Sequence, residues 1–168
     1  MKLKFLQSVV IGSLLCSTMV PSLVKAEQDI TQAQPELGKK SLTIIDRKGQ
    51  KHIFSVEIAS SLKEQETGEM FRNNIPENGG MLFVWPTPQQ SSMWMKNTRV
   101  PLDIIFIDQD GNIQTIAENT VPYSLKPISS RGLVRATLEL KGGITEKLGI
   151  LVGDKVDSPA LKTQNKQN

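Results

Sequence analysis

The stretch GGMLFVWPTPQQSSMWMKNTRVPLDIIFID, residues 79–108, contains both tryptophans of the chain and three of its six methionines. At its centre Trp94-Met95-Lys96-Asn97-Thr98 leads through Arg99-Val100-Pro101 into Leu102-Asp103. An aromatic, a cation, an amide and a carboxylate lie within ten residues. This density indicates a specified local structure and makes the stretch the first place to look for a site.

Short β-rich runs on both sides of this stretch predict hairpins. Residues 41–47 and 51–59 flank Lys48-Gly49-Gln50, and residues 102–108 and 113–117 flank Asp110-Gly111, a strong hairpin signal. Residues 133–141 alternate, which predicts a strand with one apolar face made of Val134, Ala136, Leu138 and Leu140.

The remaining elements are short. Residues 81–85 read as a buried strand closed by Pro86, residues 86–92 as a loop and residues 93–97 as a strand. Residues 118–132 read as irregular, and residues 150–156 as a last short strand. Ser61-Leu62-Lys63-Glu64 matches a capping box, which predicts a helix over residues 62–71, and residues 144–148 suggest one or two helical turns.

Many short strands with few helices predict a mainly β fold. The expected architecture is an antiparallel jelly-roll-like sandwich or a partly open barrel with one or two short helices. We expect a single β-rich domain over residues 41–157, after a flexible polar lead at 27–40 and before a polar tail at 158–168.

Residues 1–26 have the features of a secretory signal peptide. Lys2 and Lys4 precede an apolar run, and Val24-Lys25-Ala26 offers small residues for cleavage before Glu27. An uncleaved membrane anchor is the alternative, but the run is short for a spanning helix. The sequence therefore predicts an exported protein, periplasmic or extracellular, with no stable membrane insertion after cleavage.

Cleavage changes the charge and the cysteine content. The segment holds three of the 20 basic residues and no acid, so 17 basic and 17 acidic residues remain. A neutral chain gives no electrostatic reason to expect nucleic acid as a partner. Cys16, the single cysteine, also lies in this segment, so we expect no disulfide and no thiolate chemistry.

Several short motifs together identify a family. They are Gly68-Glu69-Met70-Phe71-Arg72, Gly80-Met81-Leu82-Phe83, Trp94-Met95-Lys96-Asn97-Thr98, Pro101-Leu102-Asp103 and Leu138-Glu139-Leu140. In this order and spacing the chain resembles the domain of unknown function 192 family, over residues 41–157. The resemblance implies a compact, mostly antiparallel β fold and no established reaction.

The chain departs from the family pattern at two places. Gln65 and Glu69 stand where the family usually has arginine and leucine, and Ile128-Ser129-Ser130 stands where it tends to have Tyr-x-Ser. The resemblance therefore carries no role for that arginine or that tyrosine to this chain.

Trp94, Lys96 and Asn97 form the first candidate site. On a strand, Trp94 and Lys96 would share one face, where an indole can stack on a sugar while the ammonium and amide bind its polar groups. The alternative is structural: Trp94 would pack in the core, and Lys96 would pair with Asp103 or Glu139.

Asp103 and Glu139 are acids embedded in apolar β pattern. As a pair across a cleft they could serve as general acid and base in glycoside hydrolysis, with Lys96 stabilising developing charge. The alternative is structural, with Asp103 capping a turn and Glu139 bonded to a backbone amide, Arg135 or Arg72. Arg72 completes the predicted ligand-binding set of Trp94, Lys96, Asn97, Asp103, Glu139 and Arg72.

The sequence does not contain the residue sets that usually bind metals or cofactors. His52 is the only histidine, and we read it as a surface residue, without partners for a zinc site or a nucleophilic triad. Asp108, Asp110 and Asn112 lack the rest of a calcium loop and suit a hairpin turn. We expect no metal and no cofactor.

The function that follows is binding rather than catalysis. The expected ligand is a polar small molecule such as a glycan, or else an envelope protein. Two alternatives remain: a hydrolase using Asp103 and Glu139, and a purely structural or assembly module marked by an exposed apolar patch.

Overall fold

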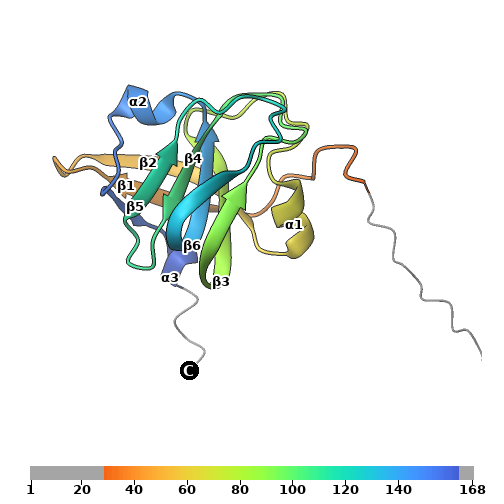
Figure 1. Cartoon of the computed structure of the whole chain (residues 1–168). Helices are drawn as coiled ribbons and strands as arrows, with labels where there is room; N and C mark the ends of the chain where they lie inside the picture. The colour runs from red at the N-terminus through yellow and green to blue at the C-terminus, as the bar shows by residue number, and fades with distance from the viewer. Residues whose placement is uncertain (1–28, 163–168) are drawn as a thin grey trace, which may run out of the picture.

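The computed structural model describes residues 29–162, so the predicted signal peptide, residues 1–26, and the last six residues lie outside the described part. Figure 1 shows the arrangement of the elements. They are, in chain order, β1 (Lys39–Ile45), β2 (Lys51–Ala59), α1 (Leu62–Thr67), β3 (Gly79–Met93), β4 (Leu102–Ile107), β5 (Ile113–Ala117), β6 (Ile128–Lys141), α2 (Ile144–Leu148), β7 (Lys155–Asp157) and α3 (Pro159–Lys162).

The strands form a single curled sheet in the order β5-β4-β6-β3-β2-β1-β7. All neighbours are antiparallel except β2 and β3, which are parallel. The two edges approach each other at a bridge between Asn112 and Lys155, and the Ile113 N–H donates to the carbonyl of Asp154 at 2.9 Å. The prediction of a mainly β, partly open barrel is therefore confirmed, and the curled sheet is not a two-sheet sandwich.

The main core fills the inside of this half-barrel. Alternate residues of the strands supply it, among them Leu42, Phe54, Leu82, Ile105 and Leu138. Strand β4 is buried on both faces, because Ile104 and Phe106 pack into a second cluster on its other side. Helices α2 and α3 lie at opposite ends of the barrel (Figure 1).

Local turn and capping signals predicted several elements correctly. The predicted β1–β2 hairpin forms and buries Phe54 and Val56, and the β4–β5 hairpin turns at Gly111, whose φ of 82° suits glycine. Ser61 and Glu64 form the predicted capping box of α1, and α2 lies where helical turns were expected.

Three predictions about the bounds of the strands were wrong. Strand β3 continues through Pro86 and Pro88, because the register with β6 shifts between Val84 and Gln89 and the prolines lie in that irregularity. The strand ends at Met93, and an irregular segment with a turn at residues 96–97 stands in place of the predicted strand. Strand β6 begins at Ile128, inside the segment expected to be irregular.

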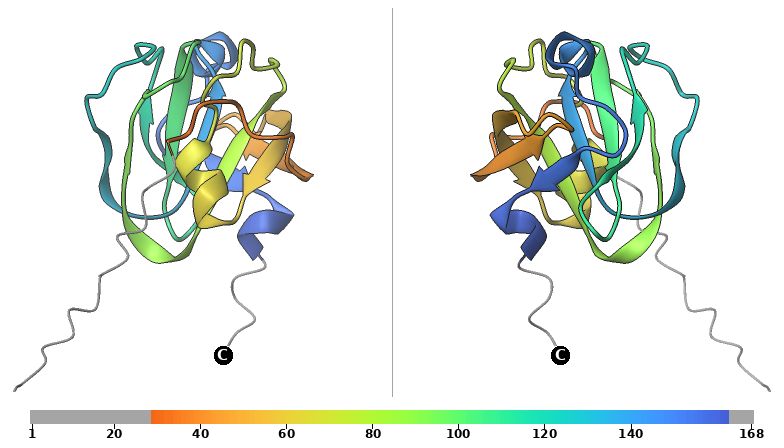
Figure 2. Two further views of the ribbon diagram at one scale, coloured as in Figure 1. Left: turned by 90° about the vertical axis from the view of Figure 1, so that its right-hand side faces the viewer. Right: turned by 90° about the vertical axis from the view of Figure 1, so that its left-hand side faces the viewer.

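The ends of the domain also differ from the prediction. Strand β1 starts at Lys39, and the lead before it is held by Gln34, whose Nε2 donates to the carbonyl of Gly68 at 2.9 Å. Figure 2 shows this lead on the same side of the molecule as α1. At the other end, β7 is only three residues long, and α3 buries Ala160 and Leu161 where a polar tail was expected. No helix within residues 29–162 is long and apolar enough to cross a membrane.

Candidate functional site

A cavity of about 710 Å³ lies beside α1 and contains most of the predicted site residues. It is within the usual size range of small-molecule pockets. Its lining includes Phe83, Trp85, Trp94, Lys96, Asn97 and Glu139. We call it the aromatic cavity.

The turn at the rim of the aromatic cavity is held in an uncommon backbone conformation. Phe71, Asn97 and Tyr123 have φ values of 63°, 57° and 61°, which bulky residues rarely adopt. The Phe71 N–H donates to the carbonyl of Asn97 at 2.9 Å, and the Tyr123 N–H donates to that of Thr98 at 3.2 Å. Strained backbone of this kind is concentrated at functional sites in proteins.

Trp94 is exposed at this rim. Its relative exposure is 48%, and the Lys96 Nζ lies 5.1 Å from the centre of its ring. The shared strand face proposed for the two residues is wrong, because β3 ends at Met93 and Lys96 lies in a turn, yet they still contact each other. The structural alternative is also wrong: Trp94 is outside the core, and Lys96 forms no ion pair with Asp103 or Glu139.

Phe83 and Trp85 form the apolar wall. Both belong to β3, and their rings stack with centroids 6.3 Å apart at an interplanar angle of 27°. The indole Nε1 of Trp85 is buried and has no hydrogen-bond partner. Aromatic faces beside a polar floor are a common arrangement in ligand pockets.

Glu139 lies in the floor of the aromatic cavity. On β6 it stands opposite Met81 of β3 and Ile104 of β4, and it is only 4% exposed. Burial raises its pKa to about 8, and the neighbouring Glu69 carboxylate adds to the rise while Arg72 opposes it. Glu139 is therefore mostly protonated at neutral pH.

The absence of a side chain at Gly68 leaves space for the side chains in the floor of the aromatic cavity. Its φ of 48° ends α1, and a Cβ there would lie 3.2 Å from the Phe83 ring and 3.7 Å from Oε2 of Glu139. The glycine therefore allows the end of the helix to approach the two side chains that line the cavity.

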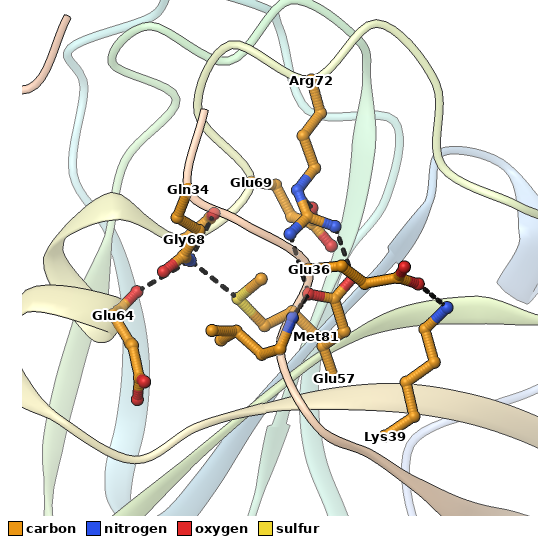
Figure 3. A network of polar contacts seen from close by, with 10 residues as sticks. Gln34, Glu36, Lys39, Glu57, Glu64, Gly68, Glu69, Arg72 and Met81 are labelled. Carbon is orange, nitrogen blue, oxygen red and sulfur yellow. Dashed lines mark hydrogen bonds and ion pairs between the residues drawn. The ribbon is translucent and has the colours of Figure 1, made fainter. Parts of the chain in front are cut away.

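Arg72 lies behind the floor in a buried ionic network (Figure 3). Its Nη1 and Nη2 donate to the two Glu57 carboxylate oxygens at 2.5 and 2.8 Å, and its Nε lies 3.0 Å from Glu69. The Leu37 N–H also donates to Glu57, at 2.7 Å. The guanidinium and this N–H lower the pKa of Glu57 against the opposing effect of burial.

Glu69 has a weaker set of partners. Its Oε1 has no hydrogen-bond partner, and burial raises its pKa to about 7 although Arg72 opposes the rise. Arg72, Glu57 and Glu69 line a second cavity of about 500 Å³. Arg72 thus neutralises buried acids and does not line the aromatic cavity.

Asp103 belongs to neither cavity. It is fully buried, and its carboxylate accepts from the backbone N–H groups of Asn119, Gly143 and Thr145 at 2.8 to 2.9 Å and from the Thr145 hydroxyl at 2.7 Å. These bonds tie β4 to the start of α2. Asp103 therefore caps a turn, which was the structural alternative to a catalytic role.

The proposed Asp103–Glu139 acid pair is contradicted by the sheet. Asp103 is paired with Leu140 across β4 and β6, so Glu139, one residue earlier, projects from the opposite face. One carboxylate supports α2 and the other lines the aromatic cavity, so they cannot act on one bond.

His52 is buried, contrary to the surface position that we predicted. It is 6% exposed, and its Nε2 lies 3.6 Å from Oδ2 of Asp46 in the β1–β2 turn. Asp108 accepts the Asp110 and Asn112 N–H groups at 2.9 and 2.8 Å, which organises the hairpin turn. Within residues 29–162 no three His, Cys, Asp or Glu side chains are placed to hold a metal ion.

Sequence reasoning thus named four residues that the fold brings together: Trp94, Lys96, Asn97 and Glu139. It missed Glu57, Phe83, Trp85 and the role of Glu69. A signal for Glu69 was present, since an acid stands where the family has leucine. No local signal indicated that Glu57 would meet Arg72.

Comparison with known proteins gives the family. The model of the DUF192 family, described as an uncharacterised group, matches residues 43–158, and no curated protein matches the chain. Among solved structures, a protein from Sinorhizobium meliloti 1021 described as a candidate transcription regulator is 38% identical, with a TM-score of 0.72 over 75% of this chain and 98% of that one.

A second solved structure gives the same result. A protein of unknown function from Novosphingobium aromaticivorans DSM 12444 is also 38% identical, with a TM-score of 0.71 over 74% of this chain and 90% of that one. Residues 43–158, which the family model matches, include every strand that borders the aromatic cavity. The chain belongs to the DUF192 family, whose function is unknown.

Proposed function

We propose that the protein is a binding module that holds a polar ligand, such as a glycan, in the aromatic cavity without converting it. The observation that carries this proposal is Trp94, a large aromatic that is 48% exposed at the rim of a cavity of about 710 Å³. An exposed indole loses favourable burial unless a ligand covers it.

The polar groups around the ring fit such a ligand. Lys96 and Asn97 at the rim offer donors, and Glu139 in the floor can donate or accept in its protonated form. Sugars present apolar ring faces beside hydroxyl groups, so an aromatic wall and a few polar side chains match them. These polar residues, Lys96, Asn97 and Glu139, do not include a nucleophile with an adjacent base, which supports binding over catalysis.

Tryptophan fluorescence tests the proposal directly, because both tryptophans of the chain line the aromatic cavity. The protein without residues 1–26 is titrated with soluble oligosaccharides of envelope glycans. We expect a saturable change in emission that is lost in Trp94→Ala and kept in Leu151→Ala. Leu151 is similarly exposed, at 52%, and lies outside the cavity. Equal titration of both variants would count against the proposal.

We also propose that this binding takes place outside the cytoplasm. Support comes from the charged start, apolar run and small-residue end of residues 1–26. Expression of the full chain in a bacterium, followed by fractionation and mass spectrometry, should give a mature protein that begins at Glu27. An intact N-terminus in the cytoplasmic fraction would contradict export.

A second candidate function is the docking of an envelope protein. The loop between β5 and β6 exposes Val121, Tyr123 and Leu125 at 69%, 61% and 64%, and exposed apolar groups favour protein contacts. In vivo crosslinking from position 125, compared with position 151, distinguishes this function. A specific crosslink at the loop that survives Trp94→Ala would favour protein docking.

A further inference from the structure

The floor of the aromatic cavity contains an acid that the protein itself leaves without a partner. Glu139 is 4% exposed and lines the cavity, and its side chain makes no hydrogen bond or ion pair with the described residues. Buried carboxyl groups are normally paired. A buried, unpartnered acid facing a cavity indicates that the ligand supplies the partner.

The charges around the cavity specify the sign of that partner. Its charged lining residues are four acids and one base: Asp29, Glu66, Glu69 and Glu139 against Lys96. Lys96 is exposed at the rim, whereas Glu69 and Glu139 are buried in the floor. Each of the two floor acids can become a carboxylate and neither can become positive, so the floor can complement a cation but not an anion.

The aromatic wall favours the same sign. The faces of Phe83, Trp85 and Trp94 carry negative charge density, which attracts ammonium groups. The structure already contains one such contact, since the Lys96 Nζ lies 5.1 Å from the centre of the Trp94 ring. A primary ammonium therefore fits this surface.

We infer that the polar ligand of the aromatic cavity carries an ammonium group, as an amino sugar does, and that this group binds Glu139. The inference rests on the proposed function and specifies its ligand class. The hydroxyl groups of the ligand then face Lys96 and Asn97, and its ring lies against Trp94.

Binding of an ammonium group should displace a proton. The charged groups that act on Glu139 are Glu69 and Arg72, and those at the rim are Asp29, Glu66 and Lys96. The free protein keeps Glu139 protonated at pH 6.5, because burial raises its pKa to about 8. A cation beside it favours the carboxylate, so the ligand lowers this pKa and releases the proton to solvent.

Two tetrasaccharides that differ only at nitrogen test the inference: the glucosamine tetramer and its N-acetylated counterpart. Calorimetry is done at pH 6.5 in two buffers of different ionisation enthalpy. We expect the glucosamine tetramer to bind about tenfold more tightly and to release a proton, and the neutral tetramer to release none.

The variant Glu139→Gln preserves shape and the neutral state, so it should fold, which its circular dichroism and melting temperature verify. We expect it to lose the tenfold preference and the proton release, so that it binds the two tetramers with equal affinity. The control Glu146→Gln removes an exposed acid of α2 outside the cavity and should behave as the parent protein.

Three outcomes would overturn the inference. If both tetramers bind equally, the ammonium preference fails and the proposed function stands. If the preference persists in Glu139→Gln, Glu139 is not the group that binds the cation. If neither tetramer changes the fluorescence or the heat, both the inference and glycan binding at this cavity fail.

Discussion

Asp103 illustrates how a single carboxylate can organise a turn. It accepts three backbone N–H groups and one hydroxyl, which link β4 to the loop before β6 and to the start of α2. Hydrogen bonds to a charged acceptor are stronger than those between neutral groups. Its place in the Pro-Leu-Asp motif is therefore explained by structure and not by catalysis.

Asp103→Asn should destabilise the fold strongly. The amide keeps the size of the side chain but turns an NH₂ toward donors, so buried N–H groups lose their acceptor. We expect the free energy of unfolding to fall by about 2–3 kcal/mol in urea denaturation. Asp110→Asn, at an exposed turn position, should change it by less than about 0.5 kcal/mol. A similar small change at position 103 would contradict the role.

Arg72→Met tests the ionic network behind the cavity. The methionine fills part of the space but leaves Glu57 and Glu69 buried without their cation. We expect a loss of about 3 kcal/mol in the free energy of unfolding at pH 7. Arg131→Met, at an exposed position, is the matched control. Equal stability of the two variants would show that Glu57 finds another partner.

At the scale of single residues, the sequence could identify which residue types are suited to a site, but not which of them lie close together in space. The unusual cluster of Trp94, Lys96 and Asn97 was visible as a local pattern, and all three line one cavity. Glu57 and Arg72 are 15 residues apart and meet only because the chain folds back after α1. Such a contact depends on tertiary packing, which no local pattern encodes.

At the scale of elements, α1 depends on its capping box. The Ser61 hydroxyl accepts the Glu64 N–H at 3.3 Å, and the Glu64 carboxylate accepts the Ser61 N–H at 2.8 Å. The helix is only six residues long, so its capping contributes a large share of its stability.

Ser61→Ala should lower the free energy of unfolding by about 1 kcal/mol. Because α1 borders the aromatic cavity, faster amide hydrogen exchange should accompany this loss at residues 64–68. Lys63→Ala, which changes an exposed side chain of the same helix, should leave both measurements nearly unchanged. Slow exchange in Ser61→Ala would mean that tertiary contacts hold the helix without its cap.

The central elements show where sequence patterns fail. Pro86 and Pro88 predicted a loop, but β3 passes through them because the irregular pairing with β6 needs no N–H there. The alternation of Met93 and Met95 with Trp94 and Lys96 predicted a strand. In the structure Met95 is buried between exposed Trp94 and Lys96, but the segment contains a turn with Asn97 in the left-handed region. In both cases the tertiary context overrode the local preference.

At the scale of the whole molecule, two buried acids make stability depend on pH. Burial raises the pKa of Glu69 to about 7 and that of Glu139 to about 8, whereas unfolded glutamate titrates near 4.3. Between these values the folded protein binds more protons than the unfolded chain, so stability falls as pH rises. Glu57, whose pKa is lowered, acts in the opposite sense and only at acidic pH.

We therefore expect the free energy of unfolding to fall by about 2–4 kcal/mol between pH 5 and pH 8. Glu139→Gln should remove most of this slope and be more stable than the parent protein at pH 8. Glu77→Gln, which changes an exposed acid paired with Lys147, should keep the slope. Urea denaturation at several pH values measures all three, and a flat profile for the parent protein would refute the expectation.

The approach of β5 to β7 has a consequence for how other proteins can bind. Sheets with free edges can recruit a peptide as an additional strand. Here Asn112 and Lys155 bridge the two edges, and β7 has only three residues, so the described chain offers little strand edge for such pairing. A partner must therefore recognise side chains at the ends or on the outer face of the barrel. The same closure also protects the protein against edge-to-edge aggregation.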